Sequence, residues 1–150
     1  MNKITPFLWF GSHAEDAAAF YLEIFKNSKT IGVMPGPDNK PFGVTFEIEG
    51  QRIIAFNGGS QFKLNEALSL MINCDDQAEV DYYWEKLSEG GEIQACGWLK
   101  DKFGLSWQIT PKALMTMMSD PDREKAGRAM QAMLQMTKID IAKIEEAFNG

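Results

Sequence analysis

Apolar and polar positions follow two different periods along this chain, and each change of period marks an expected element. Val44, Phe46 and Ile48 alternate with polar neighbours, as residues do on a half-buried strand. Apolar residues between positions 17 and 25 recur instead near the period of a helix. In the first half the pattern predicts a helix over about 12–27 and strands over 5–10, 30–34, 44–48 and 52–57.

The second half of the chain repeats this order. A strand over 67–73 leads to a helix over about 76–87 that stops at Gly90-Gly91, and strands over 92–99 and 105–110 follow. This copy has one strand fewer than the first. One such module cannot bury both faces of its sheet, so the two are expected to pair, with their helices on the outer faces.

Three of the predicted helices begin at residues suited to capping. Ser12 with Glu15, and Asp76 with Glu79, have the spacing of a capping box, in which each side chain bonds the other residue's backbone N–H. Asp120-Pro121 predicts an N-cap followed by proline at the first helical position.

The last 40 or so residues do not repeat the order of strands and helix found in the two halves. Helices are expected over 111–118, from Pro121 to about Met136, and over 139–148. Core or dimer packing is the expected role of the methionines here, and a flexible ligand-binding surface is the alternative. Six of the nine methionines lie in this segment: Met115, Met117, Met118, Met130, Met133 and Met136. The expected domains are 1–110, with modules of about 1–60 and 65–110, and a helical extension over 111–150.

Composition limits the partners. With 45% hydrophobic residues the 150-residue chain can build a core, while its net charge of −6 argues against nucleic acid or an anionic membrane as the main partner. No apolar run approaches the ~18 residues of a spanning helix, and the N-terminus does not read as a signal peptide. Cys74 and Cys96 form no CxxC motif, so we expect two free thiols and a cytoplasmic location.

A single histidine, His13, restricts the chemistry. A metal site with two histidine ligands from one chain is excluded, and so is a Ser-His-Asp triad unless His13 is its base.

Several motifs together resemble one family. The chain is similar to the PhnB-like branch of the vicinal oxygen chelate superfamily, which includes glyoxalase I, extradiol dioxygenases and bleomycin and other antibiotic-resistance proteins. The branch is often labelled 3-demethylubiquinone-9 3-methyltransferase. The resemblance implies paired βαβββ modules that form an open, barrel-like sheet. It is carried by Thr5-Pro6-Phe7-Leu8-Trp9-Phe10, Ala19-Phe20-Tyr21, Phe56-Asn57-Gly58-Gly59, Cys96-Gly97-Trp98-Leu99-Lys100-Asp101, Phe103-Gly104, Ser106-Trp107-Gln108 and Lys138-Ile139-Asp140-Ile141-Ala142.

The resemblance also implies a pocket between the modules, with ligand-binding positions on the first and last strand of each. Matched strand by strand, these positions are Thr5, Asn57, Ser69 and Gln108, where the family usually has His, Gln or Glu. All are neutral and weak ligands for a transition metal, so no standard metal site is expected, although a divalent metal remains an alternative. Strand alternation adds four neighbours to the predicted ligand-binding set: Phe7, Trp9, Asn73 and Ser106.

Three functions are compatible with these residues, and the choice between enzyme and binding protein stays open. The first is binding of a small organic molecule by hydrogen bonds and stacking. The second is a metal-dependent lyase, isomerase or dioxygenase, and the third is the methyltransferase of the family label. Gly58-Gly59-Ser60 leads toward a strand and not toward a helix, unlike the Gly-rich loop of most S-adenosylmethionine sites, and we interpret it as a turn. A homodimer is expected.

Overall fold

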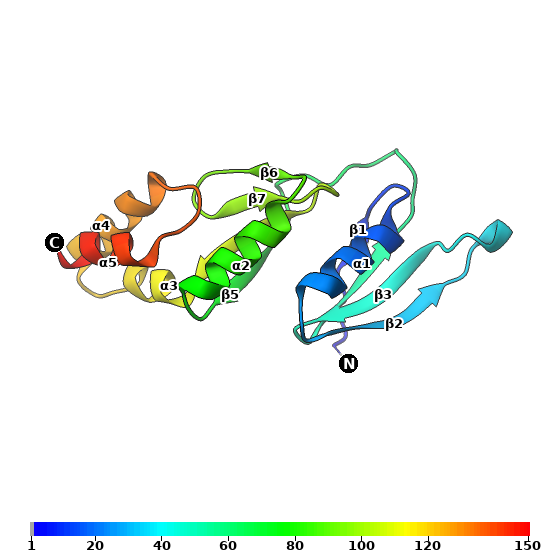
Figure 1. The fold of residues 1–150 in the computed structure, drawn as a ribbon, viewed down its shortest axis with the longest axis horizontal. Helices are drawn as coiled ribbons and strands as arrows, with labels where there is room; N and C mark the ends of the chain where they lie inside the picture. The colour runs from blue at the N-terminus through cyan, green and yellow to red at the C-terminus, as the bar shows by residue number, and fades with distance from the viewer. Residues whose placement is uncertain (1) are drawn as a thin grey trace. The chain divides into compact units, whose positions relative to one another are not determined.

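The chain folds into two compact units, each built on its own sheet (Figure 1). The computed structural model describes residues 2–150. One unit ends at Asn65 and the other runs from Glu66 to Gly150. Each contains a four-stranded sheet and a covering helix, so the predicted α+β class is confirmed. None of the helices over residues 2–150 is long and apolar enough to cross a membrane.

The first unit has strand order β1-β4-β3-β2, in which β1 runs parallel to β4 and the other neighbours are antiparallel. One face of this sheet packs against α1, because alternate positions such as Leu8, Phe46 and Ala55 are apolar and buried there. The elements are β1 (Phe7–Trp9), α1 (Ala14–Ile24), β2 (Ser28–Met34), the short 3-10 helix η1 (Pro37–Asn39), β3 (Gly43–Ile48) and β4 (Gln51–Phe56).

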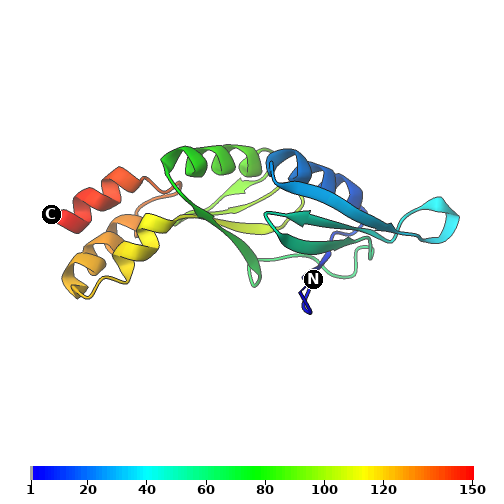
Figure 2. The ribbon, with the colours of Figure 1, turned by 90° about the horizontal axis from the view of Figure 1, so that it is seen from below.

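The second unit repeats this plan with strand order β5-β8-β7-β6, and β5 runs parallel to β8. Figure 2 shows α2 lying along one face of this sheet. Val80 and Leu87 of α2 are buried, and so are Leu99 and Trp107 of the sheet. The elements are β5 (Ser69–Cys74), α2 (Gln77–Ser88), β6 (Glu92–Ile93), β7 (Trp98–Lys100) and β8 (Ser106–Pro111).

The expectation that the second module lacks a strand was wrong. The predicted strand over 92–99 is two strands, β6 and β7, because the chain turns between them. Cys96 and Gly97 have φ values of 61° and 81°. Their backbone N–H groups donate to the carbonyls of Met136 and Thr137, at 2.8 Å each. A segment that lies some 40 residues further along the chain therefore stabilises the break.

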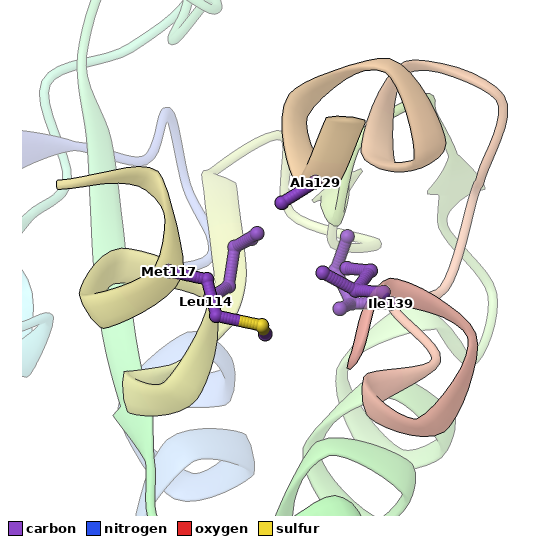
Figure 3. Packing of buried hydrophobic residues seen from close by; sticks show 5 residues of the cluster. Leu114, Met117, Ala129 and Ile139 are labelled. Atoms are coloured by element: carbon purple, nitrogen blue, oxygen red, sulfur yellow. The ribbon is translucent and has the colours of Figure 1, made fainter. Parts of the chain in front are cut away.

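Three helices complete the second unit: α3 (Lys112–Met118), α4 (Arg123–Leu134) and α5 (Ile141–Asn149). Their apolar residues form a small core of their own, in which Leu114 and Met117 of α3 lie opposite Ala129 and Ile139 (Figure 3). The core packing predicted for the methionines is confirmed for four of them, whereas two are exposed. Those in or against the core are Met117, Met118, Met133 and Met136, and the exposed ones are Met115 and Met130.

Side-chain caps differ from prediction at α1 and agree with it in part at α2. The Ser12–Glu15 capping box was wrong, since α1 has His13 at its N-cap and no capping bond from that side chain. At α2 half of the predicted capping box is confirmed: Asp76 accepts the Glu79 N–H at 2.9 Å. The Glu79 carboxylate reaches back one residue further than expected, to the N–H of Asp75.

The predicted cap at Asp120-Pro121 was also wrong. Asp122 is the N-cap of α4, and its carboxylate accepts the N–H groups of Glu124 and Lys125. Asp120 instead accepts the N–H of Asp122 at 2.8 Å, a local turn that holds the capping residue in place.

Candidate functional site

The face of the second sheet opposite α2 carries a row of polar side chains. Leu70, Leu99 and Trp107 are in register and point to the α2 side, so their neighbours in sequence point to the other face. We call this the polar face. Its residues are Ser69, Met71 and Asn73 on β5, Ser106, Gln108 and Thr110 on β8, and Trp98 and Lys100 on β7.

The structure brings together the predicted site residues of the second module. Ser69 is in register with Ser106, and Asn73 is in register with Thr110 further along the same pair of strands. The side-chain amide of Gln108 donates a hydrogen bond of 2.9 Å to the Ser69 hydroxyl. Gln108 is therefore held by Ser69, another residue of the predicted ligand-binding set.

Ser106 has an unusual environment within this face. Its side chain is completely buried, and its hydroxyl has no hydrogen-bond partner among residues 2–150. A buried hydroxyl without a partner costs about 1–3 kcal/mol, and buried polar groups in folded proteins rarely lack one. The hydrogen-bonding capacity of this hydroxyl is therefore unused among the described residues.

Lys100 and Glu66 are two charged residues of this region outside the predicted ligand-binding set. Lys100 lies in register with Ser106 on the neighbouring strand, and its ammonium contacts the Glu66 carboxylate at 2.9 Å. The hydrogen bond from Lys100 lowers the pKa of Glu66, and the same bond raises the pKa of Lys100. Alternation of Trp98, Leu99 and Lys100 could have revealed Lys100, whereas Glu66 lies in a coil without any period.

The first sheet carries aromatic side chains on the face opposite α1. Phe7 and Trp9 share this face, as predicted from alternation, and both contact Phe56 with ring centroids 5.0 and 5.2 Å away. Phe62 adds an edge contact to Trp9 at 5.0 Å. We call these four residues the aromatic face. Phe7 is 52% exposed, so flat apolar surface is accessible here.

Gly58 and Gly59 hold Trp9 in position. The indole N–H of Trp9 donates to the carbonyl of Gly59 at 2.8 Å. A Cβ atom at position 58 would lie 2.3 Å from the indole ring, so only glycine fits beneath it. The turn predicted here has its left-handed residue at Gly59, with φ of 87°, while Gly58 is required by close packing.

Thr5 and Asn57, the other predicted ligand-binding residues of the first unit, lie outside the aromatic face. Thr5 precedes β1 and is half-buried. The Asn57 side chain accepts the first N–H of α1, from Ala14, at 2.8 Å, and donates to the Pro41 carbonyl and to the Glu15 carboxylate. These bonds make Asn57 the cap of α1. Its contact with a ligand stays a prediction.

The buried thiol of Cys74 is unsuited to act as a nucleophile. Cys74 is buried, and desolvation raises the pKa of its thiol to about 12, so it is protonated at neutral pH. His13 is exposed, and its Nδ1 atom lies 3.8 Å from the Oδ2 atom of Asp16. Within residues 2–150 no three His, Cys, Asp or Glu side chains gather as a metal-binding group.

Comparison with known proteins identifies relatives for the first 110 residues or so. A family model described as 3-demethylubiquinone-9 3-methyltransferase matches residues 2–110. A comparison with curated proteins gave no match. Among solved structures, a putative 3-demethylubiquinone-9 3-methyltransferase, PhnB protein, from Bacillus cereus is 30% identical, with a TM-score of 0.68. The similarity covers 73% of this chain and 99% of that protein.

Two more distant structures share the fold. A fosfomycin resistance protein, FosX, from Listeria monocytogenes, complexed with Mn(II) and sulfate, is 20% identical with a TM-score of 0.55. The similarity covers 71% of this chain and 88% of that one. A protein from Pseudomonas aeruginosa is 19% identical with a TM-score of 0.64, over 74% of this chain and 98% of that one. The family match ends before α3, so the helical extension lies outside it.

Proposed function

We propose that this chain, which belongs to the 3-demethylubiquinone-9 3-methyltransferase family of the vicinal oxygen chelate superfamily, binds a small organic molecule. The polar face of the second unit supplies hydrogen bonds to the ligand. The site uses no standard metal centre. The predicted position of this site between the modules stays a prediction.

The buried hydroxyl of Ser106 is the observation that carries this proposal. It lies on the same face as the hydrogen-bonded pair Gln108 and Ser69 and has no partner of its own among the described residues. A ligand oxygen or nitrogen that bonds Ser106 recovers the free energy lost by burying that hydroxyl. Small-molecule sites in proteins commonly combine a few such polar groups with apolar and aromatic surface.

Residue chemistry favours this function over the two alternatives. The matched ligand positions Thr5, Ser69 and Gln108 are neutral, whereas transition metals in proteins prefer imidazole, thiolate or carboxylate. The Gly58-Gly59 segment leads through a coil into β5, not into a helix whose N-terminus could hold a charged cofactor group. Metal-dependent catalysis and methyl transfer therefore have less support than binding.

Replacement of Ser106 by alanine is expected to weaken binding without harming the fold. Loss of one hydrogen bond lowers the affinity about three- to tenfold. Unfolding should require the same free energy or about 1 kcal/mol more, because the unsatisfied hydroxyl is gone. Affinities for benzamide, phenol, indole and benzoate, measured by thermal shift with EDTA present, together with urea unfolding curves, test both effects.

Matched variants separate the polar face from general effects. Ser119→Ala removes an exposed serine hydroxyl at the end of α3 and is the control for Ser106→Ala. Gln131→Leu changes an exposed glutamine on α4 and is the control for Gln108→Leu on the polar face. Ser119→Ala and Gln131→Leu should bind like the native chain, and Gln108→Leu should bind weakly. Binding that is equal in all of them, or that disappears with EDTA, would overturn the proposal.

A homodimer is the second part of the proposal. Met115, Met130 and Leu134 of the helical extension are exposed apolar side chains, and burial of such surface favours association. Light scattering at micromolar concentration is expected to give twice the mass of the 16.9 kDa chain. A monomer mass would contradict it.

A further inference from the structure

We propose that the polar face binds an oxyanion group of the ligand between Lys100, Ser106 and Ser69, and that Glu66 competes with the ligand for Lys100. The inference rests on the proposed ligand-binding function and specifies the chemical class of the ligand, an organic molecule with a carboxylate or phosphate group.

The three donors come from neighbouring strands in register. Ser106 on β8 is directly opposite Lys100 on β7 and Ser69 on β5. Residues opposite one another across a sheet have Cβ atoms roughly 4.5–5.5 Å apart and share a face. Lys100, Ser106 and Ser69 therefore lie on one row of the sheet, with Ser106 at its centre.

The donors and acceptors of this row are unbalanced. The lysine ammonium carries N–H donors only, and each serine carries one O–H donor. The Ser69 oxygen already accepts the Gln108 amide, which directs its own proton elsewhere. The Ser106 hydroxyl is buried without a partner among residues 2–150. A group made of acceptors, as carboxylate and phosphate oxygens are, complements this set better than a donor does.

Glu66 already places a carboxylate on this lysine. Its Oε1 lies 2.9 Å from the Lys100 ammonium, and its side chain is 51% exposed in a coil that precedes β5. A ligand oxygen can replace the exposed Glu66 carboxylate on Lys100 without unpacking the core. Glu66 thus shows that this ammonium can donate to a carboxylate. The Glu66 carboxylate must give way, at least in part, to an anionic ligand.

Opposite effects of two substitutions test this arrangement. In ¹H–¹⁵N NMR titrations of the full chain we expect acetate, benzoate or inorganic phosphate to give saturable shifts at Ser69, Lys100 and Ser106. Acetamide and benzamide, the neutral counterparts, serve as matched probes. Lys100→Met should weaken binding of the anions at least tenfold and leave the neutral probes unchanged. Glu66→Gln should strengthen binding of the anions at least threefold.

The outcomes distinguish the inference from the function on which it rests. Equal affinity for benzoate and benzamide, unaffected by Lys100→Met, would overturn the oxyanion site and leave organic-ligand binding intact. No saturable shift on the polar face with any probe would overturn both. Acetate binding without phosphate binding identifies the group as a carboxylate, and the reverse identifies it as a phosphate. Lys138→Met, which removes the lysine paired with Asp81 at 2.9 Å, is the control for general charge and should change no affinity.

Discussion

Replacement of Asp101 by asparagine is expected to lower the free energy of unfolding by about 3–5 kcal/mol, because a buried carboxylate with three donors is lost. One carboxylate oxygen accepts the N–H groups of Phe103 and Leu105, at 2.9 and 3.1 Å, and the other accepts the indole N–H of Trp107 at 2.9 Å. Asparagine keeps one acceptor oxygen and turns its NH₂ group toward a donor. Urea unfolding followed by circular dichroism measures the loss.

A double-mutant cycle with Trp107→Phe shows whether the lost stability comes from the asparagine NH₂ group facing the indole N–H of Trp107. Phenylalanine removes the indole N–H while keeping an aromatic ring in the core. In the native background this change should be destabilising, since Asp101 loses a bond. In the Asp101→Asn background it should cost clearly less, because the two facing donors no longer conflict. Additive effects of the two substitutions would contradict this account of the hydrogen bonds to Asp101.

The second large effect is expected from Gly97→Ala, which should cost about 2–4 kcal/mol. Gly97 has φ of 81°, and a Cβ atom there would lie 2.9 Å from the Ile109 carbonyl and 3.0 Å from the Ile139 side chain. Backbone strain accounts for about 1–2 kcal/mol, and the close contacts account for the rest. Gly97 precedes Trp98 of the polar face, and its N–H donates to the Thr137 carbonyl. The amide NMR shifts of Trp98 and Thr137 should therefore change along with the loss of stability.

Two other glycines provide matched controls for this substitution. Gly104 has φ of 91° but open space where a Cβ atom would lie, so Gly104→Ala reports strain alone and should cost about 1–2 kcal/mol. Gly127 lies inside α4 with open space around it, so Gly127→Ala should stabilise by up to about 1 kcal/mol. The packing argument fails if Gly97→Ala costs no more than Gly104→Ala.

Local patterns predicted correctly which strand residues share a face. The shared face of Ser69, Ser106 and Gln108 follows from the two-residue period of a strand, and the shared face of Phe7 and Trp9 follows in the same way. The ligand-binding roles of these residues stay predictions. Glu66 and Phe62, in contrast, lie in coils, and no period in the sequence indicates which strand residues they contact.

The sequence by itself determined most of the elements and their faces, because helical and strand periods are properties of neighbouring residues. Tertiary structure decided the features that depend on distant partners. The strand break at Cys96-Gly97 is stabilised by carbonyls of the helical extension, and α1 is capped by Asn57, 43 positions beyond Ala14. The unpartnered Ser106 hydroxyl is likewise a product of packing, since burial and loss of water are set by residues that meet only in the folded chain.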